Sequence, residues 1–425
     1  MTGMLTAPDL DPDVAAVAPD ADDDAPVVAA PIFSLPPLEP GSTVAEALYL
    51  VWSGNPVTIV DSPPGAGKTR LVSHVTGHLA VRSDITIAVA TPTRAQAIGI
   101  AAAIARVTPA GTVVLAEKGW QVADIPEGVT YDPNASSRLA PGKVVIRNLK
   151  KWSFGPPEAD LLIIDEAYQA TYASVLAIAG KVSQILMVGD PGQIGPVTSV
   201  NTSVWEGNYD APHLRAPEAF TQRADVRTVH LRSSFRLGPA TVKAIGGLYA
   251  FPFDSARPQL SLGNLPEIES VRVFSGGDKD IMSMLEVVAK RAAALVGQTF
   301  REQGQPDRPL TGEDVVVLVA HNTQVAIVQG FLANLCQPEI TVGTADKLQG
   351  GQWAAAVALD GLVGAPSASG HGGALGRLCV MASRHRAHLT WVHDGTWADL
   401  IDEDEDLTMK DQRLMHSVRA ALCAS

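Results

Sequence analysis

The chain has 425 residues, of which 46% are hydrophobic and 18% charged, a composition typical of a globular protein with two or three domains. No apolar run is long enough for a membrane helix, and the acidic N-terminus is unlike a signal peptide, so no membrane partner is expected. The three cysteines lie far apart, at Cys336, Cys379 and Cys423, which indicates a reducing, cytoplasmic location rather than a disulfide framework or a zinc cluster.

The net charge of −13 is concentrated in two short segments. Residues 1–24 contain seven aspartates and no basic residue, and residues 399–406 contain six carboxylates. These groups account for the whole net charge, so charge alone neither supports nor excludes a polyanionic partner. Residues 1–42 are rich in Ala, Pro and Asp, which predicts a disordered acidic tail that could bind a protein partner.

From residue 43 the pattern alternates between β and α. Strands are expected over 56–61, 85–91, 144–147, 161–165 and 185–189, with helices over 69–81 and 94–106. Short β-branched runs separated by helices indicate a parallel sheet covered on both faces. We expect a first domain over 43–222, with a small irregular insertion at about 107–158.

A second set of strands and helices follows. Strands are expected over 228–231, 271–274, 315–320, 340–344, 355–360 and 389–393, and helices over 238–249, 280–298, 322–335 and 373–383. They predict a second domain over 223–398, followed by an acidic linker and a C-terminal helix over 399–425. The predicted fold class is therefore α/β, with two tandem lobes, parallel sheets and a cleft between the lobes.

A Gly/Pro-rich loop over 62–69 follows the first expected strand and opens the first expected helix. This arrangement is typical of a site for a nucleoside triphosphate, because backbone N–H groups and the helix N-terminus surround the phosphates. The expected binding residues are Pro64, Gly65, Ala66, Gly67, Lys68 and Thr69. Lys68 would reach the β and γ oxygens, and Thr69 would bind Mg²⁺. Ser62 stands where the pattern has Gly, and an ordinary strand–turn–helix is the alternative interpretation.

Two later strands end in polar residues that suit phosphate chemistry. The apolar run 161–164 ends in Asp165, which would hold Mg²⁺ through water, and Glu166, which would deprotonate the attacking water. The next strand leads to Gln193, which can contact a γ-phosphate and report its presence. The alternatives are a strand capped by solvated acids and a Gly/Pro turn.

The order of these motifs resembles that of the superfamily 1 helicases, two-lobed motor ATPases that move along nucleic acid. The resemblance covers about residues 56–394. Beyond the phosphate loop it is carried by seven segments, at 91–95, 165–167, 189–193, 231–236, 316–324, 344–350 and 377–384. Seven segments in the family's order make accidental agreement rare. The resemblance implies two tandem RecA-like P-loop domains with an ATP cleft between them, with ATP and Mg²⁺ as cofactors.

The resemblance also assigns roles to residues of the second lobe. Phe235 is expected to lie against the base, and Arg236 and Arg384 to reach the γ-phosphate when the cleft closes. Gln352 stands at the ribose contact, where the family usually has Glu. Residues 1–67 contain no Gln that could read adenine, so base selectivity is expected to be loose.

Single-stranded nucleic acid is the partner that the resemblance implies, with DNA favoured over RNA. The expected contact residues are hydroxyl, basic and aromatic side chains, namely Thr91, Thr93, Thr344, Lys150, Lys151 and Trp152. For the last three, a solvated basic edge with a packed Trp is the alternative.

Three functions stay open from the sequence. The first, and the one we expect, is an ATP-dependent motor, although only 107–158 and 250–312 could hold the inserted subdomains that help to unwind a duplex. The second lobe slightly favours the 5′→3′ branch, and the direction of movement stays open. The second is a P-loop switch that binds nucleic acid without moving along it. The third is another P-loop enzyme, such as a small-molecule kinase.

Overall fold

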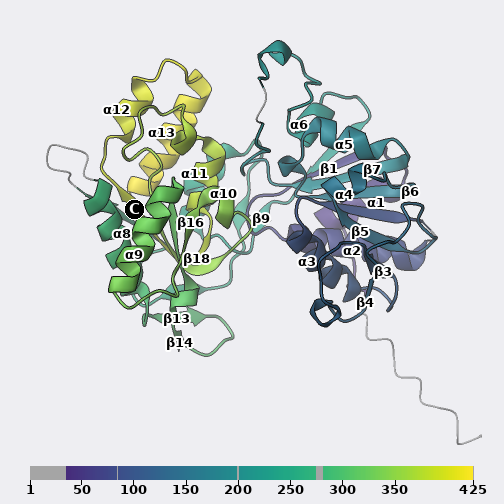
Figure 1. Cartoon of the computed structure of the whole chain (residues 1–425), viewed down its shortest axis with the longest axis horizontal. Helices are drawn as coiled ribbons and strands as arrows, with labels where there is room; N and C mark the ends of the chain where they lie inside the picture. Colours follow the sequence, from purple (N-terminus) through teal and green to yellow (C-terminus); the bar gives the residue numbers. More distant parts are fainter. Residues whose placement is uncertain (1–34, 84, 199–200, 274–280, 425) are drawn as a thin grey trace, which may run out of the picture. The chain divides into compact units, whose positions relative to one another are not determined.

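The computed structural model describes residues 35–83, 85–198, 201–273 and 281–424. Most of the predicted acidic tail therefore lies outside the described residues. The predicted α/β fold with two parallel sheets is confirmed (Figure 1). None of the helices in the described ranges combines the length and the apolar character that a membrane crossing requires.

The first lobe is built on an eight-stranded sheet in which every neighbouring pair is parallel. In spatial order its strands are β4 (Val129–Tyr131), β3 (Val113–Leu115), β5 (Val144–Asn148), β2 (Ile87–Thr91), β6 (Ala159–Asp165), β7 (Val182–Gly189), β1 (Val57–Asp61) and β8 (Val226–His230). Its helices are α1 (Thr43–Trp52), α2 (Lys68–Arg82), α3 (Arg94–Ala105), α4 (Leu149–Ser153), α5 (Tyr172–Ala179) and α6 (Ala216–Phe220).

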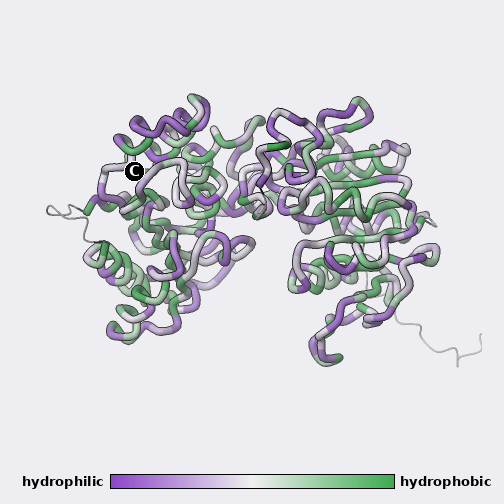
Figure 2. Tube along the Cα trace, turned by 45° about the horizontal axis from the view of Figure 1, so that its top comes forward, coloured by the Kyte–Doolittle hydropathy of each residue, from purple (hydrophilic) through white to green (hydrophobic). Residues whose placement is uncertain are grey.

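Alternation along the strands divides the core of this lobe between two faces. On β1, Val60 packs with residues of α1, α2 and α3, while Ile59 packs with residues of α4, α5 and α6. A strand with side chains buried on both faces reads as a run of consecutive apolar residues, as residues 161–164 of β6 do. Hydrophobic segments accordingly lie inside each lobe and hydrophilic ones mark the outer loops (Figure 2).

The second lobe has a five-stranded parallel sheet. In spatial order its strands are β12 (Ile268–Arg272), β18 (His385–His393), β17 (Trp353–Leu359), β15 (Val315–Val319) and β16 (Thr341–Thr344). Its helices are α7 (Pro239–Ile245), α8 (Ile281–Leu295), α9 (Asn322–Asn334), α10 (Ala345–Leu348), α11 (Leu375–Ala382), α12 (Trp397–Asp402) and α13 (Met409–Cys423). On β17, Ala356 packs with the α7, α11 and α13 side and Val357 with the α8 and α9 side.

Shorter strands lie before and between these elements. β9 (Ser233–Ser234) pairs with β10 (Asp254–Ser255), and β11 (Leu260–Leu262), β13 (Thr299–Glu302) and β14 (Arg308–Pro309) form a small three-stranded sheet. The last helix, α13, is bound to the second lobe by Arg419, whose Nε donates to both carboxylate oxygens of Asp360 at 3.1 and 3.0 Å. Both side chains are fully buried.

Two expectations about the first lobe are wrong. The strand expected at 228–231 was assigned to the second lobe, yet β8 pairs with β1 and its Val229 joins the first core, so the boundary falls after residue 230 rather than 222. The region 107–158 is also not a separate insertion, because β3, β4 and β5 complete the sheet. The strand expected at 271–274 begins earlier, at Ile268.

Candidate functional site

The phosphate loop connects β1 to α2 with the geometry that the sequence predicts. Gly65 and Gly67 have φ angles of +75° and +89°, which L side chains rarely adopt, so glycine is required at both positions. Lys68 is the first residue of α2. Among the described non-glycine residues only Glu166 and Cys336 have a positive φ, which explains why Ser62 is tolerated where the pattern has Gly.

A segment from beyond the first sheet lies directly against this loop. The N–H of Phe235 donates to the carbonyl of Gly65 at 3.0 Å, and the Ser234 hydroxyl donates to the carbonyl of Pro64 at 2.7 Å. A Cβ on Gly65 would collide with Cβ of Arg236. The phosphate loop and the Arg236 segment are thus in contact, and a side chain at residue 65 would separate them.

The acidic pair at the end of β6 faces the phosphate loop. Glu166 Oε1 lies 3.5 Å from Lys68 Nζ, and Glu166 has a left-handed backbone with φ of 52°. Burial, with the neighbouring charge of Glu166 as a second cause, raises the pKa of Asp165 to about 7. Asp165 Oδ1 is buried without a hydrogen-bond partner among the described residues. A buried carboxylate oxygen without a donor suits a metal ion or its bound water, and the hydroxyl of Thr69 is the second expected ligand.

Gln193 connects the two lobes through its side-chain amide. Its Nε2 donates to Asp190 Oδ2 at 2.6 Å, and its Oε1 accepts from Nε2 of Gln349, in the second lobe, at 3.1 Å. The Tyr249 hydroxyl donates to the other oxygen of Asp190 at 2.9 Å and lies 3.4 Å from Sγ of Cys379 on α11. The loop after β7 is therefore held by side chains of the second lobe as well as by its own.

Three arginines of the second lobe line the same cavity as the phosphate loop. The cavity has a volume of about 510 Å³, and its lining includes Lys68, Glu166 and Gln193 of the first lobe. The arginines are Arg236, Arg384 and Arg386. This cavity therefore brings predicted site residues of both lobes together.

The arginines are held in different ways. Nε of Arg236 donates to Oε1 of Gln352 at 2.9 Å, and burial, followed by the nearby charge of Arg384, lowers the pKa of Arg236 to about 10. Arg384 is fully buried and donates to Ser383 Oγ at 2.9 Å. Its Nε is buried and has no hydrogen-bond partner among the described residues, an unusual state for a buried donor. Arg386 pairs with Glu302 of β13.

A second cavity, of about 630 Å³, adjoins the first. Both are lined by Ala66, Gly67 and Phe235, and the second also by His74 and by residues 37–46 and 228–233. The side chain of Phe235 is 54% exposed, so its ring is available to a ligand in either cavity.

The predicted nucleic-acid residues are placed less favourably. Thr91 is fully buried and donates to the carbonyl of Thr93 at 2.9 Å, and Thr344 is also buried. Thr93 is exposed, although its hydroxyl bonds within the cap of α3. Lys150 is exposed, whereas the amino group of Lys151 donates to two backbone carbonyls.

Trp152 is a wrong prediction as a stacking residue. Its ring is fully buried, Nε1 donates to the carbonyl of Val89 at 2.9 Å, and Arg147 lies 4.3 Å over the ring. The exposed aromatic at this position is Phe154, with 83% of its side chain exposed. Trp152, within α4, therefore faces the core, whereas Phe154, directly after α4, faces solvent.

Sequence reasoning missed several residues of the site. Arg386, on β18, lies two residues after Arg384, which immediately precedes that strand, and this spacing could have been read from the sequence as placing both side chains on one side of the chain. Gly350 also lines the cavity. Tyr249 gave no such signal, because its contact with Asp190 joins residues 59 positions apart.

Comparisons with known proteins identify the first lobe. Residues 44–216 match the protein family described as the AAA domain. No curated protein matches the chain. Solved structures that are similar include an arterivirus nonstructural protein 10 (helicase), with 18% identity and a TM-score of 0.47 over 84% of this chain and 63% of that one.

Two further structures give similar values. The PRRSV helicase is 16% identical, with a TM-score of 0.45 over 82% of this chain and 54% of that one. The arterivirus protein in complex with DNA is 16% identical, with a TM-score of 0.46 over 84% and 64%. The chain spans less than two thirds of the length of these structures.

Residues 44–216 of the first lobe are therefore similar to an AAA domain. That match, together with the arrangement of the family's motifs around one cavity, confirms the predicted resemblance to the superfamily 1 helicases. The branch within that superfamily stays a prediction.

Proposed function

We propose that the protein hydrolyses ATP with Mg²⁺ and couples hydrolysis to movement along single-stranded nucleic acid. One observation carries the proposal: the phosphate loop, Glu166 and three arginines of the second lobe line a single cavity. A P-loop kinase would instead need a pocket for an acceptor substrate beside the phosphates. The arginines and Gln193 connect the site to the second lobe, which favours a motor over such a kinase.

The residues of the cavity have distinct roles in this proposal. Lys68 and the backbone N–H groups of the loop bind the β- and γ-phosphates, which draws Lys68 away from Glu166. Glu166 then accepts the proton of the attacking water. Arg236 and Arg384 balance the charge that develops on the γ-phosphate. Mg²⁺, held by Thr69 and through water by Asp165, would neutralise charge on the phosphate oxygens.

Phe235 and the second cavity are the proposed base site. The ring is exposed and borders both cavities, so a base can stack on it while the phosphates occupy the loop. The lining of the second cavity contains no Gln or Asn among its described residues. We therefore propose that GTP is accepted as well as ATP, with kcat/KM values within about tenfold of each other.

The nucleic-acid contact is proposed for the carboxyl ends of β2 and β5, which lie side by side because Thr91 pairs with Asn148. Thr93, Lys150 and Phe154 follow these ends and are exposed. An exposed ring beside a cation suits a single strand, because bases stack and phosphates attract basic groups. DNA stays favoured over RNA as a prediction.

The decisive measurement is the ATP hydrolysis rate with single-stranded DNA, single-stranded RNA and no polymer. We expect stimulation by at least one polymer, and a loss of turnover of about 10²- to 10⁴-fold in Glu166→Gln, because its proton acceptor is removed. Lys68→Ala should abolish hydrolysis by weakening phosphate binding. Unchanged turnover in both variants would contradict the proposal.

A strand-displacement assay distinguishes a motor that moves along nucleic acid from a nucleotide-switched binding protein that does not. A motor displaces an annealed strand in the presence of ATP, and Glu166→Gln should not. Stimulated hydrolysis without displacement of any substrate would favour the nucleotide-switched binding protein.

A further inference from the structure

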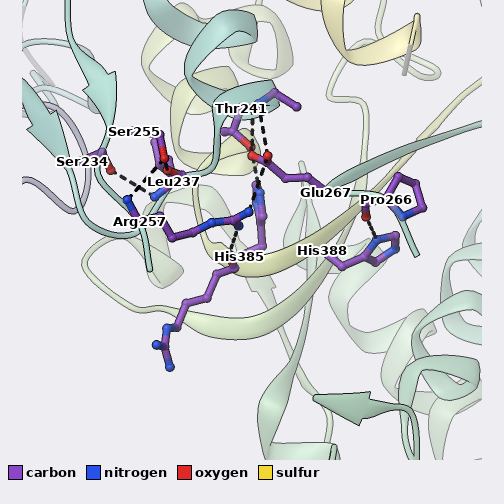
Figure 3. Close-up of polar contacts among 11 residues, drawn as sticks. Ser234, Leu237, Thr241, Ser255, Arg257, Pro266, Glu267, His385 and His388 are labelled. Atoms are coloured by element: carbon purple, nitrogen blue, oxygen red, sulfur yellow. Dashed lines mark hydrogen bonds and ion pairs between the residues drawn. The ribbon is translucent and has the colours of Figure 1, made fainter. Parts of the chain in front are cut away.

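Glu267, just before β12, binds the start of α7 with its carboxylate (Figure 3). Oε2 accepts from the N–H of Ala240 at 3.1 Å, and Oε1 accepts from the N–H and the hydroxyl of Thr241 at 2.9 and 2.5 Å. The side chain of Glu267 is only 11% exposed. Because α7 follows Phe235 and Arg236 within a few residues, this carboxylate fixes the point at which the Arg236 segment ends.

The same hydroxyl connects this segment to β18. Thr241 Oγ1 lies 2.9 Å from Nε2 of His385, the residue after Arg384 (Figure 3). Since the one hydroxyl hydrogen is donated to Glu267, the imidazole must donate through Nε2–H. Burial lowers the pKa of His385 to about 3, so the ring is neutral and has one N–H. Its Nδ1, which carries no hydrogen in this tautomer, has no hydrogen-bond partner among the described residues.

Arg257 makes a second connection from the carboxylate to β18. Its Nη2 lies 3.7 Å from Oε2 of Glu267, and its Nη1 donates to the carbonyl of Arg386. Ser255 adds to this arrangement by donating from its hydroxyl to the carbonyl of Leu237 at 2.6 Å. Glu267 is thus bonded, directly or through one side chain, to both of the segments that carry arginines into the cavity.

The carboxylate of Glu267 lies so close to the backbone of Gly238 that no side chain fits there. A Cβ on Gly238 would collide with Oε2 of Glu267 and Nη2 of Arg257. Gly238 lies between Arg236 and α7, so only a residue without a side chain lets the carboxylate approach this closely. Glu267 itself does not line the cavity.

We propose that Glu267 is a positioning residue that keeps the Arg236 segment and the segment 384–386, which leads into β18, at a fixed separation. The inference depends on the proposed function, because the arginines need correct placement only if they act on a γ-phosphate. Loss of the carboxylate would let the two segments move independently, and a small displacement of a charge-stabilising group is costly to turnover.

The test is Glu267→Gln in the full chain, measured by ATP hydrolysis with saturating polymer and by binding of a fluorescent ATP analogue. Gln keeps the volume but replaces one acceptor oxygen by a donor and removes the charge that Arg257 faces. We expect kcat to fall on the order of 10- to 100-fold, with analogue affinity and KM changed by less than about threefold. Thr241→Val, which removes the hydroxyl but keeps the packing, should lower kcat in the same way.

The matched control is Glu286→Gln, which neutralises an exposed glutamate paired with Lys290 on α8. It should hydrolyse like the unaltered protein. A kcat of Glu267→Gln and Thr241→Val equal to that control would overturn the inference, as would an affinity loss that accounts for the whole effect. If Glu267→Gln proves unfolded by circular dichroism, Thr241→Val decides the question by the same criteria.

Arg384→Ala supplies the second comparison. If Glu267 acts through the arginines, the combined variant should lose clearly less activity than the product of the two single losses. A fully multiplicative loss would show that Glu267 acts elsewhere. Failure of the proposed function is recognised separately, because the unaltered protein would then hydrolyse no ATP.

Discussion

Glu166 has a backbone conformation that residues with side chains rarely adopt, with φ of 52°. Such conformations persist where the surroundings enforce them, and they are frequent at functional sites. Here the conformation follows directly from β6 and brings the carboxylate to 3.5 Å from Lys68. The two catalytic candidates are thus paired with each other until phosphate competes for the lysine.

Asp165 makes the stability of the protein depend on pH. Because its pKa is raised to about 7 in the folded protein, the folded state binds more protons than the unfolded state between about pH 4 and pH 7. The stability that this group contributes is therefore present at low pH and lost as the pH rises through 7. Asp165→Asn should be more stable than the unaltered protein at pH 7.5, and the difference should shrink towards pH 5.

Urea unfolding at these two pH values, without nucleotide or Mg²⁺, measures that difference. Asp124→Asn, at an exposed position, is the control for the substitution of Asp by Asn. A difference between Asp165→Asn and the unaltered protein that is independent of pH would contradict the assigned shift.

At the scale of elements, the two aromatic residues at the end of α4, Trp152 and Phe154, are expected to have different roles because the first is buried and the second is exposed. Phe154→Ala should reduce the stimulation of hydrolysis by single-stranded DNA by about tenfold or more without affecting folding, because stacking on a base is worth roughly 1–3 kcal/mol.

Trp152→Ala should instead lower the free energy of unfolding by about 3–5 kcal/mol, because its buried ring fills the core. Polymer titrations and thermal unfolding of both variants distinguish these effects. Equal polymer affinity in Phe154→Ala would refute the contact.

Strands with apolar side chains on both faces were well predicted from the sequence. β1, β2, β6, β7 and β15 each contain several buried apolar residues, and each was expected within a few residues of its bounds. β8 was placed in the wrong lobe because alternation defines a strand but not the strand with which it pairs. β3 and β4 are three residues long, too short for a periodic signal, so the segment that holds them was not assigned.

In the site, too, features set by the local sequence can be predicted, whereas contacts between distant segments cannot. Loop residues such as Gly65 and Lys68 are fixed by local chain geometry, and their motif predicted them. Trp152 was misassigned because a motif cannot tell which side of a short helix is buried. Tyr249 and Glu267 act through contacts between distant segments, which a single sequence does not reveal.

At the scale of the whole molecule, Tyr249 is expected to help couple the lobes. Tyr249→Phe keeps the ring but removes the hydroxyl that binds Asp190, leaving that buried carboxylate with fewer donors. We expect the stimulated rate of hydrolysis to fall about 10- to 100-fold, with a smaller effect on the rate without polymer, since one hydrogen bond to a charged group is worth roughly 1.5–3 kcal/mol. Tyr49→Phe, an exposed residue on α1, is the control. An equal fall in both rates would argue against coupling.

The buried ion pair between Arg419 and Asp360 binds α13 to the second lobe, and α13 contributes side chains to the core of that lobe. Arg419→Met should lower the free energy of unfolding by roughly 3–5 kcal/mol, because it strands a negative charge in an interior that excludes water. Chemical denaturation checks this, and a stability unchanged from that of the unaltered protein would mean that Asp360 finds another counter-charge.

A practical rule for protein engineering follows. A fragment trimmed to end at residue 398 would retain every motif on which the proposed ATP hydrolysis depends. It would lack the cation that Asp360 binds, and it would expose the hydrophobic surface against which Val418 and Leu422 pack. Such a truncation should precipitate or fail to express, and its inactivity would say nothing about catalysis.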